Sequence, residues 1–67
     1  MMKYDVGIHL IDGDFLRVTL DGIERGMFLN VLDRPGVSWV IVPDGDGSEC
    51  IIRRDRIKYV RITALYE

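Results

Sequence analysis

The sequence predicts a small, mainly β domain, at the margin of the α+β class, with five antiparallel strands and one short helix between the second and third strands. Three observations predict this fold: two runs of strand-forming residues that each turn back at a turn signal, a further apolar run near the C-terminus, and a segment with helix-capping residues between the two hairpins. Five short strands in 67 residues favour a strongly bent antiparallel sheet or a small barrel that closes to remove its edges. A flatter sheet with the helix packed on one face is the alternative.

The first hairpin joins two predicted strands, residues 4–10 and 16–20. Apolar residues alternate with more polar ones in both, which is the period of two of a half-buried strand. Asp12 and Gly13 lie between them and favour a type I′ turn, in which both central residues need a positive φ. The alternation places His9 on the more polar face, so we expect it to face solvent or a partner.

The second hairpin and the last strand lie in the C-terminal half. Residues 37–42 are rich in β-branched and aromatic side chains, and the apolar run resumes at residues 50–52. Between them, residues 43–47 read Pro-Asp-Gly-Asp-Gly and predict the turn. Residues 57–62 predict the last strand.

Residues 21–36 fit a short helix better than a strand. Asp21 followed by Glu24 matches a helix capping box. Apolar residues recur at a spacing of four and a Pro-Gly pair ends the segment: Ile23, Met27, Val31, Pro35 and Gly36. Gly26 disfavours the helix by about 1 kcal/mol relative to Ala, and a strand over residues 28–32 is the alternative.

The size of the chain predicts one domain, residues 1–67, that gains stability by self-association. A domain this small buries only about 60% of the surface that its unfolded chain exposes. Cys50 is the only cysteine, so a disulfide within one copy is excluded, and Cys50 with His9 cannot fill the four positions of a structural zinc site. We therefore expect a homo-oligomer with no metal or other cofactor.

Charge and hydropathy disfavour several classes of protein. The net charge of −2 argues against a protein whose whole surface binds phosphates. No apolar run reaches the about 18 residues that a membrane span needs, and the apolar stretch of a signal peptide is missing. A single cysteine without a secretion signal predicts a cytoplasmic protein.

One predicted strand is apolar on both faces. Within residues 37–42, Val40 and Val42 fall on one face, and Trp39 and Ile41 fall on the other. Such a strand must be covered twice, by the helix on one face and by a second copy on the other. Tryptophan is also a favoured interface anchor. We therefore predict an interface that includes Trp39, Val40 and Val42, with burial of Trp39 in the core as the alternative.

Basic residues concentrate near the C-terminus, where five lie within nine positions with one opposing acid. They are Arg53, Arg54, Arg56, Lys58 and Arg61. In an extended strand Arg56 and Lys58 share one face and suit an anionic ligand, and Tyr59 offers a ring for stacking on single-stranded bases. The alternative is a solvated strand whose cations pair with Asp44, Asp46 and Glu49.

Two stretches resemble the motifs of the Sm-like small barrels, the family of the bacterial Sm-like RNA chaperones. Residues 6–16 alternate apolar residues around Asp-Gly, as in the first motif, and residues 52–60 are similar to the second motif in spacing. The hairpin pattern is also similar to that of Src-homology-3-like barrels. The resemblance implies an RNA-base pocket to which Arg53 carries over, whereas Arg54 replaces the glycine of the family motif and its Asn has no counterpart here.

These observations favour a non-enzymatic binding or assembly module that self-associates. No nucleophile motif accompanies His9, and no glycine-rich phosphate loop opens a helix. The alternative function is RNA binding by an Sm-like protein through Arg53, Arg54, Arg56, Lys58 and Tyr59. A third is an accessory or phage-type small protein without an independent ligand.

Overall fold

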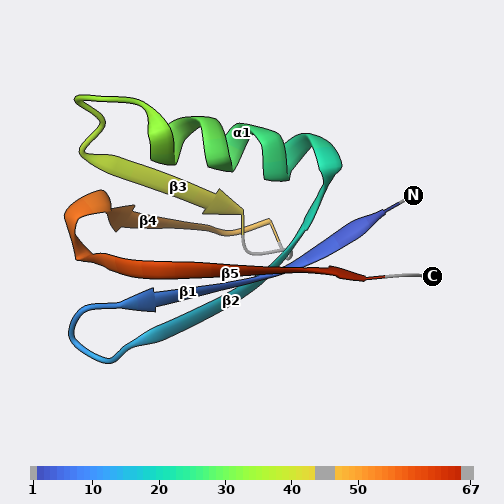
Figure 1. Ribbon diagram of the computed structural model, residues 1–67, viewed down its shortest axis with the longest axis horizontal. Helices are drawn as coiled ribbons and strands as arrows, with labels where there is room; N and C mark the ends of the chain where they lie inside the picture. Colours follow the sequence, from blue (N-terminus) through green and yellow to red (C-terminus); the bar gives the residue numbers. More distant parts are fainter. Residues whose placement is uncertain (1, 44–46, 66–67) are drawn as a thin grey trace.

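The structure is a computed structural model that describes residues 2–43 and 47–65. Its elements follow in the order β1 (Lys3–Leu10), β2 (Phe15–Asp21), α1 (Gly22–Asp33), β3 (Trp39–Pro43), β4 (Glu49–Arg53), the short 3-10 helix η1 (Arg54–Arg56) and β5 (Ile57–Leu65) (Figure 1). The mainly β class and the position of the helix between the second and third strands are confirmed. No helix in the described part of the chain is long and apolar enough to cross a bilayer.

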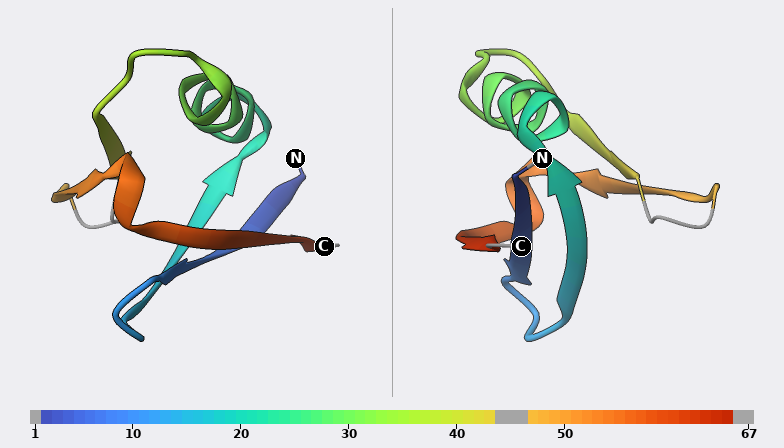
Figure 2. Two further views of the ribbon diagram at one scale, coloured as in Figure 1. Left: turned by 60° about the vertical axis from the view of Figure 1, so that its left-hand side comes forward. Right: turned by 90° about the vertical axis from the view of Figure 1, so that its right-hand side faces the viewer.

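The strands form two antiparallel sheets instead of one. The first has the order β2-β1-β5 and the second is the β3-β4 hairpin, and over the described residues they do not close into a barrel. The helix α1 connects β2 to β3, and η1 connects β4 to β5. Both connections between the two sheets are therefore helical, and strands that follow each other across them are not hydrogen-bonded neighbours. The β3-β4 hairpin reaches away from the three-stranded sheet (Figure 2).

The first hairpin is confirmed, but its turn is not the predicted type I′. The Gly13 amide donates to the Leu10 carbonyl at 3.1 Å, and the Leu10 amide donates to the Asp14 carbonyl at 2.9 Å. Gly13 has φ 94°, whereas no non-glycine residue of the described chain has a positive φ. Asp12 instead uses its side chain, which accepts from the Asp14 amide at 3.1 Å. The loop is therefore longer than two residues and needs only one left-handed position.

The helix α1 begins at the predicted capping box. The Asp21 side chain accepts from the Glu24 amide at 2.8 Å, and the Glu24 side chain accepts from the Asp21 amide at 3.0 Å. Phe28 is the buried residue of this helix. The apolar residues Ile23 and Met27, spaced by four, lie on an exposed face instead, at 77% and 65% exposure.

The core lies between the inner faces of the strands and the helix. Its buried side chains come from β1, β2, α1 and β3: Val6, Ile8, Val18, Leu20, Phe28, Val40 and Val42. Full burial of one such side chain stabilises a fold by about 1.5–3 kcal/mol. The alternation of both hairpins therefore positions one face of each sheet inward and leaves the other face available for a site.

Candidate functional site

The outer face of the β3-β4 hairpin is apolar and uncovered within one chain. Trp39, Ile41 and Ile51 are 54%, 56% and 63% exposed. Ile41 pairs directly with Ile51 in the ladder, and Trp39 pairs with Arg53. Val40 and Val42 point to the other face, so the predicted two-sided apolar strand is confirmed.

Two residues of the predicted interface are inaccessible. Val40 and Val42 are 1% and 0% exposed and belong to the core, where they pack with Phe28 of the helix. The reason is the alternation of the strand, because only one of its faces can meet the helix. Of the three interface residues predicted from the sequence, Trp39 alone lies on the surface, and it is joined there by Ile41 and Ile51.

An apolar groove lies beside this face. Its volume is about 520 Å³, and its lining comes from α1 and the hairpin: Glu24, Met27, Phe28, Val31, Trp39, Ile41, Pro43 and Glu49. Ile23 lies one turn before Met27 on the helix and is also exposed. We call the exposed side chains of Ile23, Met27, Trp39, Ile41 and Ile51 the apolar surface. Grouping of this kind marks interaction sites more often than scattered single residues do.

Arg53 lies at one end of the apolar surface. Its guanidinium carbon is 5.8 Å from the centre of the Trp39 ring, and its Nη2 is 3.3 Å from the Asp55 carboxylate. An arginine over an indole face is a favourable cation–π contact. Arg53 is therefore partly engaged within the chain and is still exposed.

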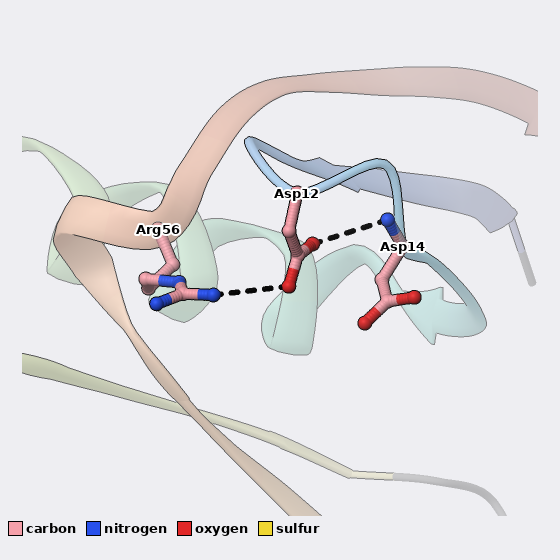
Figure 3. Close-up of polar contacts among 3 residues, drawn as sticks. All are labelled: Asp12, Asp14 and Arg56. Carbon is pink, nitrogen blue, oxygen red and sulfur yellow. Dashed lines mark hydrogen bonds and ion pairs between the residues drawn. The ribbon is translucent and has the colours of Figure 1, made fainter.

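Two further residues of the predicted basic cluster make contacts within the chain. Arg54 donates from Nη1 to the Arg34 carbonyl at 2.8 Å. Arg56 donates to the Asp12 carboxylate at 3.0 Å (Figure 3). Arg56 lies in η1 and not in an extended strand, so the prediction that Arg56 and Lys58 share one strand face is wrong. The acids that pair with the cluster are Asp55, with Arg53, and Asp12, with Arg56, while Asp44 and Asp46 of the predicted pairs lie outside the described residues.

The Asp12 carboxylate is the centre of a small polar cluster at the first hairpin turn. The hydrogen bond from the Asp14 amide, and then the one from Arg56, lower the pKa of Asp12 from its ordinary value (Figure 3). The Ile11 amide also donates to the Arg56 carbonyl at 2.9 Å. The cluster thus joins the first hairpin turn to η1.

The outer face of the three-stranded sheet carries a row of three rings. His9 of β1 pairs with Phe15 of β2 on one side and with Tyr59 of β5 on the other. The His9 ring stacks on Tyr59 with centroids 4.2 Å apart, and it lies 4.6 Å from the Phe15 ring at a tilt of 45°. The sequence prediction that His9 lies on the outer face is confirmed, and of the predicted binding residues Tyr59 belongs to this row.

Two arginines flank Gly7 in the next row of the same face. Gly7 pairs with Arg17 and with Arg61. Arg17 donates from Nε to the Asp5 carboxylate at 2.7 Å, and this hydrogen bond lowers the pKa of Asp5. Arg61 is exposed. A shallow hollow of about 350 Å³ lies among the surrounding residues: Asp5, Gly7, His9, Phe15, Arg17, Arg61 and Thr63.

Lys58 stands at an irregularity of the β1-β5 ladder. His9 pairs with Tyr59 and Leu10 pairs with Ile57, so Lys58 has no partner in the register and forms a bulge. Bulges re-aim side chains at the ends of sheets. Lys58 is exposed beside Tyr59. The bulge and the row of rings depend on the pairing of distant strands, and only the alternation of His9 signalled them in the sequence.

Comparison with protein-family models, curated proteins and solved structures found no match. The resemblance to Sm-like and Src-homology-3-like barrels therefore stays a prediction from the sequence. Among residues 2–43 and 47–65, no group of three or more His, Cys, Asp or Glu side chains is placed to hold a metal ion. Cys50 is a free, half-buried thiol on β4.

Proposed function

We propose that this chain is a non-enzymatic assembly module that self-associates through the apolar surface. The observation that carries the proposal is the grouping of Trp39, Ile41 and Ile51 on one uncovered sheet face, continuous with the groove beside α1. Trp39 is the anchor, because tryptophan contributes most where it is desolvated at the centre of an interface.

The size of the domain supports the same proposal. A single core in a chain of 67 residues rarely supplies more than about 3–5 kcal/mol of net stability. Burial of exposed apolar side chains between two copies would add to this small margin.

Sedimentation equilibrium over a range of protein concentrations tests the proposal. We expect the chain to self-associate, and we expect Trp39→Ala and Ile41→Thr each to raise the dissociation constant about tenfold or more, since 1.4 kcal/mol corresponds to a factor of ten. Ile11→Thr is the matched control, because Ile11 is 60% exposed but lies in the first hairpin turn, outside the apolar surface. A chain that stays monomeric at the highest concentration would contradict the proposal.

A second candidate function is binding of single-stranded nucleic acid on the outer face of the three-stranded sheet. It is favoured by the row of His9, Phe15 and Tyr59 next to Arg61, since aromatic rings beside cations bind bases and phosphates. This site overlaps only in part with the binding residues predicted from the sequence: Tyr59 belongs to it and Lys58 lies beside it, whereas Arg53, Arg54 and Arg56 lie outside it.

A fluorescence titration with a single-stranded oligonucleotide at several salt concentrations tests this candidate. We expect affinity to fall as salt rises, and we expect Phe15→Ala and Arg61→Ala to weaken binding, with the Arg61 variant also reducing the slope against salt. Arg53→Ala serves as the control on the other sheet. Absence of binding at low salt would remove this candidate and leave the assembly proposal untouched.

A further inference from the structure

We propose that two copies pair through the free edge of β4, antiparallel, about a twofold axis that passes beside Ile51. The inference rests on the proposed self-association and names its geometry and its occupant, a second copy of this chain. Within the described part of the chain, β4 pairs with β3 alone, so its other edge presents backbone groups without a strand partner. Such an edge is a template for a further strand.

The backbone phase of β4 determines which residues face that edge. The Arg54 amide donates to the Ser38 carbonyl at 2.9 Å, so the backbone of Arg54 points toward the β3 side. In an antiparallel ladder the direction of these groups alternates along the strand. Cys50 and Ile52 therefore point their amides and carbonyls toward β3, and Glu49, Ile51 and Arg53 point theirs toward the free edge.

The same three residues also carry side chains on the exposed face. Their ladder partners are Pro43, Ile41 and Trp39 in turn. A twofold axis beside Ile51 places Ile51 opposite Ile51 of the second copy, and it places Glu49 opposite Arg53 of the second copy. Because the operation is symmetric, the pair of opposite charges forms twice. Opposite charges directly across an antiparallel pair stabilise it, and like charges destabilise it.

The resulting sheet has the order β3-β4-β4-β3. It joins the Trp39, Ile41 and Ile51 side chains of both copies into one apolar strip on a single face. The two central Ile51 side chains contact each other across the axis, while Trp39 and Ile41 lie farther from the axis on the same face, which edge pairing alone leaves open. The charges of Glu49 and Arg53 fix the register that brings the apolar residues together.

The other edges of the molecule are less suited to pairing with a copy. β2 and β3 contact α1 and each other, which hinders access to part of their edges. β5 is also an edge strand of its sheet, and its only charged residues in the described range are Lys58 and Arg61. Pairing of two β5 strands therefore supplies no pair of opposite charges, and cations on an edge deter such pairing. Glu49 and Arg53 make β4 complementary to itself.

A charge-exchange experiment tests the inference by sedimentation equilibrium. Glu49→Arg and Arg53→Glu each convert two attractive pairs of the dimer into two repulsive pairs, so we expect each to raise the dissociation constant about tenfold or more. The double variant Glu49→Arg/Arg53→Glu restores opposite charges across the axis, and we expect it to recover dimerisation to within about threefold of the original chain. A double variant as weak as the single ones would overturn the pairing.

Disulfide cross-linking tests the same strand pairing independently. In a Cys50→Ser background, Ile51→Cys places two thiols in a directly opposed pair with Cα atoms about 5.5 Å apart, which is within the range of a disulfide. We expect a covalent dimer under mild oxidation, and we expect none from the matched control Arg61→Cys in the same background.

The outcomes separate this inference from the proposed function. A chain that dimerises while the charge variants have no effect, and while Ile51→Cys does not cross-link, keeps the assembly function and overturns the β4 pairing. A chain that stays monomeric overturns both. Dimerisation with loss and recovery in the charge series supports both.

Discussion

The outer faces of the two sheets both expose aromatic rings, but they differ in how far neighbouring side chains of the same chain cover those rings and the apolar residues beside them. On the three-stranded sheet, His9 lies between Phe15 and Tyr59, and Arg17 is paired with Asp5. On the β3-β4 hairpin, Trp39 meets Arg53 at one end, and Ile41 pairs directly with Ile51 in the ladder.

The comparison shows that exposure alone does not identify an interface. Rings that stack on each other already cover part of their apolar area, and a charge with a partner has less to gain from a ligand. On the hairpin such cover is limited to Trp39, which meets Arg53, while Ile41 and Ile51 stay exposed, and the outer edge of β4 has no strand partner in the described chain. Apolar area and an open edge coincide there, which is why we assign self-association to the hairpin and only a second candidate function to the larger sheet.

The largest expected effect on folding comes from a charge placed on the buried face of β3, compared with one on its exposed face. Val40→Asp puts a carboxyl group where the side chain is 1% exposed, and burial of such a group without a partner costs about 2–7 kcal/mol, as much as the whole stability of a domain this small. We expect this variant to be unfolded by circular dichroism.

The neighbouring variant Ile41→Asp is the control for this prediction. Its side chain lies on the outer face at 56% exposure, so we expect a change of less than about 1 kcal/mol in the free energy of unfolding, together with weaker self-association. If Ile41→Asp also unfolds the chain, the outer face is part of the core and the contrast between the faces fails.

A smaller effect on stability tests whether the Phe15 ring lies against Gly7 of the neighbouring strand. A Cβ atom at Gly7 would lie 3.0 Å from Cε2 of Phe15, so the ring must move when Gly7 is replaced. Alanine in a strand gains about 0.5–1 kcal/mol over glycine. We expect Gly7→Ala to show this gain in urea unfolding only when Phe15→Ala is also present. Equal effects of Gly7→Ala in both backgrounds would mean that the ring does not rest on Gly7.

Much of this contrast was predictable from the sequence, because it depends on local alternation. The two faces of the strand at Trp39 and the capping box at Asp21 involve neighbours in the chain. The row of rings was not predictable, because His9 meets Tyr59 only through the register of two distant strands and the bulge at Lys58. The same holds for Arg56, whose position in η1 follows from contacts with the first hairpin turn. The open arrangement of the sheets depends on how α1 packs, which periodicity does not determine.

The smallest expected effect concerns the paired carboxylates of the first hairpin. The pKa of Asp5 is lowered by the hydrogen bond from Arg17, and the pKa of Asp12 is lowered by those from the Asp14 amide and Arg56. A folded-state pKa below the unfolded value, about 3.9, stabilises the fold above that value, and the contribution disappears as pH falls through the folded pKa. We expect Asp12→Asn to lower the melting temperature slightly at neutral pH and to match the original chain in strong acid. A gap that persists in acid would assign the effect to lost geometry and not to charge.

Arg54 fixes the position of the β3-β4 hairpin relative to α1. Its main-chain amide binds the Ser38 carbonyl and its guanidinium binds the Arg34 carbonyl, so one residue secures both ends of the segment that leads from α1 into β3. The hairpin is thereby anchored at its base and presents its outer strand at a set angle to the body. Two copies paired through hairpins fixed in this way would have one relative orientation. Loss of the Arg54 side chain would make that orientation variable and would leave the paired strands intact.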